Sequence, residues 1–211
     1  DLPLSIRRQR QMCIRDSVET PHRKGSAHDR LLSAAAILFY NDGIAATGID
    51  AIVKKAGVAK KSLYNNFASK SELVEAYLQI RHAEWLSLYD TRVQQAKGPA
   101  ERVLSVFEAY ADHAEQAYER GFRGCGLLNA AAEFPAGDSG RKAVRAHKEE
   151  VESILNRHLA ELIPGDAPRA ALLARHLALL LEGSIVRAGL EGNSDCVIQA
   201  KRIAASLLEA A

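Results

Sequence analysis

The spacing of apolar residues predicts two short helices in the first third of the chain. In the first helix, four apolar residues recur at i, i+3, i+4 and i+7 and share one face: Ile49, Ile52, Val53 and Ala56. In the second, residues 59–66, Leu63 lies one turn before Phe67. Gly57 lies between the two and can take the positive φ that ends one helix and starts another at a steep angle. Residues 47–67 therefore have the pattern of a helix-turn-helix.

Helical periodicity continues through the rest of the chain, and no segment of the sequence alternates like a strand. We expect about nine helices, three short ones followed by six longer ones, and an all-α fold. The expected starts are capping residues, prolines or the residue after a turn: Ser26 with Asp29, Thr47 with Asp50, Ala59, Ser69 with Glu72, Pro99, Leu127, Asp138 or Ser139, Asp166 with Pro168, and Asn193 or Ser194. The fourth helix is expected to run to about Tyr89, and the fifth to carry its apolar stripe to Tyr118.

Composition and cysteine usage favour a soluble, cytoplasmic protein with no membrane partner. Of the 211 residues, 47% are hydrophobic, yet no uninterrupted apolar run approaches the roughly 18 residues that a membrane span needs. The three cysteines, Cys13, Cys125 and Cys196, are odd in number and widely separated. They predict a reducing compartment and no disulfide framework.

Residues 1–24 lack the periodicity of the rest and contain an arginine-rich run at Arg7, Arg8 and Arg10. Three interpretations stay open for them: a flexible basic arm that adds phosphate contacts, a disordered tail without function, or residues foreign to the natural domain. We therefore expect a disordered or non-native arm over residues 1–24. A helix-turn-helix DNA-binding domain is expected over 25–70, and a regulatory and dimerisation domain over 71–211.

Positive charge is concentrated in the helix-turn-helix. Between residues 51 and 71 there is no Asp or Glu, and there are five lysines: Lys54, Lys55, Lys60, Lys61 and Lys70. Because the whole chain carries a formal charge of only +2, this cationic window is local. A solvated lysine-rich helix face would give the same composition. The helix-turn-helix pattern favours an attraction to phosphate instead.

Residues 25 to about 85 resemble the DNA-binding domain of the TetR family of bacterial transcriptional repressors. The positions that carry the resemblance are Ala34 to Ala36, Phe39, Gly43, Ala46-Thr47, Ile49, Ile52, Ala56-Gly57-Val58, Lys60, Ser62-Leu63-Tyr64, Phe67, Ser69-Lys70 and Leu73. The helices that follow agree with the family in number and length. The resemblance implies an N-terminal helix-turn-helix domain followed by a helical bundle that binds ligand and dimerises.

The same resemblance implies that residues 59–66 form the recognition helix. The positions implied to approach DNA are Thr47, Lys60, Lys61, Ser62, Tyr64, Asn65 and Lys70. Two residues depart from the family pattern. Ala59 replaces a common Ser or Thr, which removes a side-chain N-cap worth roughly 1 kcal/mol. Lys61 replaces a common glycine, and we expect it to add a phosphate or base contact.

For the C-terminal part, the resemblance implies a homodimer through the last two helices, bound to a palindromic operator and released by a small-molecule inducer. Residues 169–186 are apolar around most of the helix circumference, as a dimerising helix requires. The candidate residues for the inducer pocket are Trp85, Tyr89, Phe107, Tyr110, His113, Cys125, Asn129 and His147. For any single one of them, plain core packing is the favoured interpretation. No cofactor is expected.

Other function classes find less support in the sequence. A thiol- or metal-responsive regulator could use Cys125 and Cys196, or histidines, in place of an organic inducer. A helical enzyme or a pure interaction module is a further alternative. The sequence has no HExxH motif, no nucleophile elbow and no phosphate-binding glycine loop, so we expect no catalytic residues and no enzyme.

Overall fold

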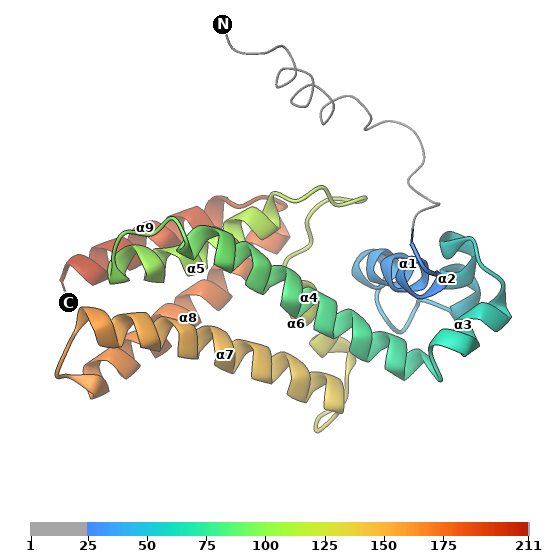
Figure 1. The fold of residues 1–211 in the computed structure, drawn as a ribbon. Helices are drawn as coiled ribbons and strands as arrows, with labels where there is room; N and C mark the ends of the chain where they lie inside the picture. The colour runs from blue at the N-terminus through green and yellow to red at the C-terminus, as the bar shows by residue number, and fades with distance from the viewer. Residues whose placement is uncertain (1–24, 211) are drawn as a thin grey trace, which may run out of the picture.

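The computed structural model describes residues 25–210, which form nine helices and no strand (Figure 1). In chain order these are α1 (Ala27–Asp42), α2 (Ile49–Ala56), α3 (Lys60–Asn66), α4 (Lys70–Val93), α5 (Pro99–Ala114), α6 (Gly126–Glu133), α7 (Ser139–Leu162), α8 (Ala167–Glu191) and α9 (Asp195–Glu209). The all-α prediction is confirmed. The arm expected over residues 1–24, including Cys13, lies outside the described residues.

Side-chain caps form at four of the expected residues, Ser26, Ser69, Asp138 and Asp166. Ser26 and Asp29 make a reciprocal capping box, in which each side chain accepts a 3.2 Å hydrogen bond from the backbone N–H of the other. Ser69 accepts from the Glu72 N–H at 3.1 Å. The Glu72 carboxylate, however, accepts from Ala68, one residue before the cap. Helices α1 and α4 therefore begin where the sequence indicated.

Three expected boundaries are wrong. Helix α2 has Gly48 at its N-cap and no side-chain cap, so Thr47 does not cap it. Helix α4 continues to Val93, one turn beyond Tyr89. Helix α5 ends at Ala114, and Tyr118 lies in the loop that follows, where its ring stacks on Tyr40 at 4.6 Å between centroids. The apolar periodicity continues to Tyr118 in the sequence, but the helix ends at Ala114.

Helix α4 connects the two parts of the molecule. Helix α1 packs against α2, α3 and α4, while α4 also packs against α5, α6 and α7. Figure 1 shows α4 running from the end that carries α1 to α3 into the larger bundle. Leu31 of α1, Leu63 of α3 and Leu73 of α4 are fully buried in one continuous core. The small N-terminal unit is too short to bury much apolar surface by itself, and α4 supplies part of its core.

The larger bundle leaves an apolar face uncovered on its last two helices. Helix α8 packs against α5, α7 and α9, and α9 also packs against α5. The large hydrophobic side chains of these two helices that stay exposed are Leu172, Leu179, Val186, Leu190, Ile198, Ile203 and Leu207. None of the helices between residues 25 and 210 is long and apolar enough to cross a membrane.

Candidate nucleic-acid interface

The turn between α2 and α3 is closed by a glycine in the left-handed region. Gly57 has φ 63° and ψ 40°, and its N–H donates to the Lys54 carbonyl at 3.3 Å. The next N–H, of Val58, donates to the Val53 carbonyl at 3.1 Å. A residue with a Cβ atom is disfavoured in this conformation, whereas glycine takes it at little cost. This position lets α3 leave α2 at a steep angle within a few residues.

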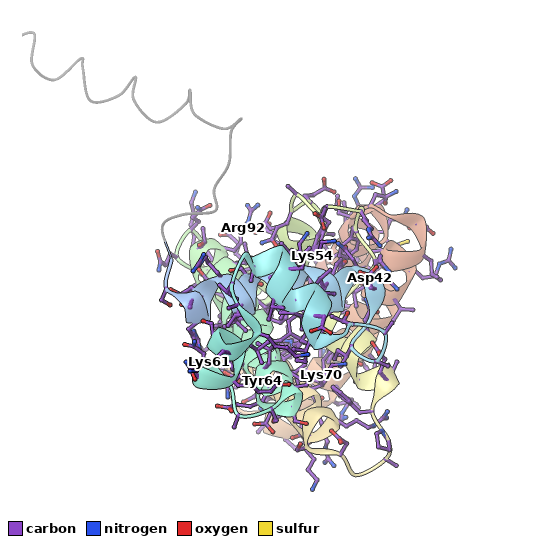
Figure 2. The ribbon with its side chains drawn as sticks, turned by 90° about the vertical axis from the view of Figure 1, so that its right-hand side faces the viewer. Asp42, Lys54, Lys61, Tyr64, Lys70 and Arg92 are labelled. Atoms are coloured by element: carbon purple, nitrogen blue, oxygen red, sulfur yellow. The ribbon has the colours of Figure 1, made fainter. Side chains whose placement is uncertain are left out.

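Helix α3 is held by its apolar side and presents a polar side to solvent. Leu63 is fully buried, and Phe67 after the helix is nearly so. Lys60, Lys61, Tyr64 and Asn65 are exposed, with Tyr64 at 54% despite its aromatic ring. Figure 2 views the helix-turn-helix end and shows Lys61 and Tyr64 together on α3. An exposed tyrosine among lysines on a short helix is suited to contacting phosphate oxygens.

The start of α3 lacks a side-chain cap, as the sequence predicted, and its last residue, Asn66, bonds back to the preceding turn. Ala59 is the N-cap and makes no side-chain hydrogen bond, so the usual cap is absent. Asn66 donates its amide to the Ser62 carbonyl at 2.7 Å, which is a helix-end role. Ser62 itself is half-buried and lies at the edge of the exposed face.

The lysines of the cationic window are not equivalent. Lys60 pairs with Asp50 of α2 at 2.8 Å, and this hydrogen bond raises the pKa of the Lys60 ammonium. Lys55 pairs with Glu119 at 2.8 Å and connects α2 to the loop after α5. Lys61 forms no ion pair with any residue from 25 to 210. Its charge therefore faces solvent without a counter-charge from the described part of the chain.

Thr47 is buried and does not belong to the exposed surface of the helix-turn-helix. Its side chain is 3% exposed, and its hydroxyl donates to the Gly43 carbonyl at 2.6 Å, with the Leu38 carbonyl 3.3 Å away. The hydroxyl thus satisfies carbonyls at the end of α1, and the expected phosphate contact is not supported for this side chain. Lys70 is half-buried, and its ammonium donates to the Ile44 carbonyl at 2.6 Å.

A carboxylate from the larger bundle binds the turn between α1 and α2. Glu133, the last residue of α6, accepts hydrogen bonds from the backbone N–H groups of Ile44 at 2.8 Å and Ala45 at 2.7 Å. Glu133 thus binds two N–H groups of this turn, and Lys70 donates to one of its carbonyls, that of Ile44. We call Glu133, Lys70 and the segment 43–47 the turn clamp. Sequence reasoning missed Glu133, because an exposed glutamate at a helix end carries no sign of a partner 88 or 89 residues away.

A second connection joins α1 to the loop between α5 and α6. The Tyr40 hydroxyl accepts from the Arg123 N–H at 2.6 Å and donates to the Gly124 carbonyl at 3.1 Å. The Arg123 guanidinium donates to the carbonyls of Tyr40 at 2.7 Å and Asn41 at 2.6 Å. The end of α1 is therefore bonded to the larger bundle through backbone as well as side-chain groups.

The family model described as "Bacterial regulatory proteins, tetR family" matches residues 31–77, which span α1 to α3 and the start of α4. The helix-turn-helix part of this chain belongs to the TetR family. The matched range contains the clamped turn, the left-handed glycine and the exposed face of α3.

Curated relatives match less than half of the chain. The HTH-type transcriptional repressor KstR2 of Mycolicibacterium smegmatis is 35% identical over 92 residues, which are 43% of this chain and 44% of the relative. The HTH-type transcriptional activator FasR of the same organism is 38% identical over 87 residues, 41% of this chain and 39% of the relative. The chain thus matches less than half the length of these relatives.

Solved structures match most of the chain. SCO4454, a TetR-family transcriptional regulator from Streptomyces coelicolor, superposes with a TM-score of 0.76 at 28% identity, covering 86% of this chain and 93% of its own. A TetR transcriptional regulator from Chloroflexus aurantiacus J-10-FL gives a TM-score of 0.73 at 23% identity, covering 87% and 94%. The second of these supports the fold alone.

The aromatic and polar residues expected to line an inducer pocket pack in the core of the larger bundle. All but Asn129 are buried. The Trp85 ring lies 5.2 Å from Tyr110 and 5.4 Å from His147, centroid to centroid. Asn129 is half-buried and donates to the Arg123 carbonyl at 3.1 Å. One of the eight residues, His147, also lines an open cleft that lies between α4 and α7.

The thiol and metal alternatives gain no support from the described residues. Cys125 is buried, and the half-exposed Cys196 donates to the Glu191 carboxylate at 3.2 Å. That hydrogen bond raises the pKa of the Cys196 thiol, which opposes activation as a thiolate. Between residues 25 and 210 no group of three or more His, Cys, Asp or Glu side chains could hold a metal ion.

Proposed function

We propose that this chain is a DNA-binding transcriptional repressor that inserts α3 into the major groove. The observation that carries the proposal is the exposed face of α3, where Lys60, Lys61, Tyr64 and Asn65 stand on a helix anchored by Leu63. Lysine and tyrosine reach phosphate oxygens, lysine can also read guanine, and asparagine can read adenine. Lys70 and Ser62 lie at the edge of this surface as secondary contacts.

The uncovered apolar face of α8 and α9 supports a homodimer. Leu172, Leu179 and Val186 recur every seven residues and are 53% to 59% exposed, and Leu190 one turn later is 80% exposed. An apolar stripe of this length on a monomer marks an association surface. A two-fold dimer would place the recognition helices about 34 to 36 Å apart, as a palindromic operator requires.

A small-molecule inducer would act through the dimer geometry. A ligand lowers operator affinity only if it prefers a dimer whose recognition helices are misspaced for the operator. The turn clamp supports such coupling, since α4 and α6 both bind the segment that leads into the helix-turn-helix. As a regulator of bacterial DNA, the protein would act in the cytoplasm.

Operator selection with the purified protein tests the proposal. We expect a palindromic site to emerge, and Lys60→Ala and Tyr64→Phe to weaken binding to it while the dimer persists. Lys142→Ala removes an equivalent exposed charge from α7 and serves as the control. Equal affinity for random DNA at physiological salt would refute specific regulation. Loss of the dimer in the α3 variants would show that this surface has another role.

A further inference from the structure

An open cleft lies between α4 and α7, beside α6. Its volume is about 380 Å³, within the range of roughly 300–1,000 Å³ that is usual for small-molecule sites. The floor is formed by the buried side chains of Leu78, Leu127 and His147. The rim carries two exposed carboxylates, Glu75 from α4 and Glu150 from α7. The cleft therefore combines an apolar floor with acidic walls.

A chain of hydrogen bonds runs through the bundle and ends at this cleft. The Lys148 ammonium lies 3.4 Å from the Tyr110 hydroxyl, which lies 3.2 Å from Nε2 of His147. Nδ1 of His147 lies 2.9 Å from Nδ1 of His82, and Nε2 of His82 is 3.5 Å from the Glu150 carboxylate. In this series, each group between Lys148 and Glu150 has one polar neighbour on either side.

The chemistry of the groups fixes the direction of this chain. An ammonium can only donate, so Tyr110 accepts from Lys148 and donates to Nε2 of His147. His147 is buried close to Lys148, and burial is the main cause that lowers its pKa to about 3. The neutral ring must therefore carry its proton on Nδ1 and donate to His82. The neutral ring of His147 therefore brings no positive charge to the cleft.

The cleft is lined by two carboxylates and by no lysine or arginine, and its other polar residues are Gln79, His82, Ser139 and His147. An anionic ligand would face Glu75 and Glu150 without a counter-charge. A cationic ligand would form ion pairs with them while its apolar part covers Leu78 and Leu127. Residues 25–210 contain no group of three or more His, Cys, Asp or Glu side chains placed to hold a metal ion, and the apolar floor suits a cation with an organic body.

We propose that the cleft between α4 and α7 binds a small organic cation with an apolar body, such as a protonated alkylamine. Glu75 and Glu150 hold the ammonium group, and the floor holds the alkyl part. As the inducer of the repressor proposed above, such a ligand would act on α4. A smaller adjoining cleft of about 280 Å³ shares Glu75 and Leu78 and reaches Ile44 and Lys70 of the turn clamp. This last step rests on the proposed function, whereas the binding itself does not.

Binding is tested with three eight-carbon probes that differ in the head group: octan-1-amine, octan-1-ol and octanoate. Trp85 is the single tryptophan of the chain, and its ring lies 5.4 Å from that of His147 in the cleft floor, so its fluorescence reports occupancy. We expect the amine to bind at least about tenfold more tightly than octanoate, because both carboxylates attract one and repel the other. Equal or tighter binding of octanoate would overturn the proposal.

Variants locate the site. Glu75→Gln and Glu150→Gln should each weaken amine binding about two- to fivefold and leave octanol binding unchanged. Glu149→Gln removes the same charge one position away, outside the cleft, and should have no effect. Ala146→Leu adds bulk at the exposed rim and should weaken all probes. An unchanged amine affinity in both glutamine variants would refute the assignment, even if the protein binds its operator normally. If the unmodified protein bound the amine but no specific operator, the proposed function would be refuted and the assignment of the cleft would stand.

Discussion

Replacing Glu133 by alanine tests whether the larger bundle sets the conformation of the turn before the helix-turn-helix. The carboxylate accepts from two backbone N–H groups at 2.8 and 2.7 Å. Hydrogen bonds to charged groups contribute about 1.5–3 kcal/mol each when shielded from solvent. Glu133 is exposed, and water replaces part of the loss. We therefore expect the turn to be destabilised locally by about 1–2 kcal/mol.

Amide hydrogen exchange measures this change directly. A loss of about 1–2 kcal/mol corresponds to roughly five- to thirtyfold faster exchange of the Ile44 and Ala45 amides. Glu133→Gln keeps a neutral acceptor and should give a smaller acceleration. Glu119→Ala is the control, because Glu119 also bridges to the N-terminal unit, through Lys55 and Asn41, without touching these amides. Unchanged exchange at both amides in Glu133→Ala would refute the clamp.

Three further changes follow from single contacts or buried groups. Asp50→Asn leaves Lys60 without its counter-charge and should raise DNA affinity about two- to fivefold in fluorescence anisotropy. This gain should shrink at high salt. Weaker DNA binding would mean that the ion pair positions the lysine. Gly189→Ala places a Cβ atom 2.6 Å from a Cα atom of the loop after α5 and should cost about 1–3 kcal/mol in urea unfolding, whereas higher stability would contradict this contact. Burial lowers the pKa of His113 to about 4 and of His147 to about 3, from 6.5. The unfolded chain therefore binds more protons below about pH 6.5, and the free energy of unfolding should fall between pH 7.5 and 5.5 by up to about 1.4 kcal/mol per pH unit for each histidine; a flat profile would contradict neutral burial.

Local signals explain why the sequence predicted the helix-turn-helix and most helix boundaries. A capping box such as Ser26 with Asp29, or a left-handed glycine such as Gly57, acts within a few residues and can be recognised without tertiary structure. The exposed and buried faces of α3 follow from the same short-range periodicity. Thr47 was misjudged because Thr-x-x-Asp fits a cap, whereas its hydroxyl turns back to the carbonyls at the end of α1.

The parts that sequence could not predict depend on contacts between distant segments. An aromatic stripe on a helix indicates burial, but not whether the buried side chains fill the interior or line a cavity. In this chain the rings of Trp85 and Tyr110 fill the interior. The cleft is lined instead by small residues of α7, such as Gly140 and Ala143, and by Leu78 of α4. Packing of this kind is a property of the assembled helices.

Besides the ion pairs of Lys55 with Glu119 and of Asp42 with Arg120, two connections link the larger bundle to the helix-turn-helix, and they need not respond to the same event. One is the turn clamp, which α4 and α6 supply. The other runs from Gly189 of α8, which lies against Gly124, through the hydrogen bonds of the neighbouring Arg123 to Tyr40 of α1. A change in the dimer face on α8 would reach α1 by the second connection.

A ligand in the cleft between α4 and α7 would act through the first connection, because the adjoining cleft extends along α4 to Lys70 and Ile44. Glu133→Ala should then reduce the effect of octan-1-amine on operator affinity while leaving its binding to the cleft intact. Gly189→Ala should alter operator affinity whether or not the amine is present. If Glu133→Ala left the amine's effect on operator affinity at full size, the signal would have to pass through α8 and the dimer interface instead.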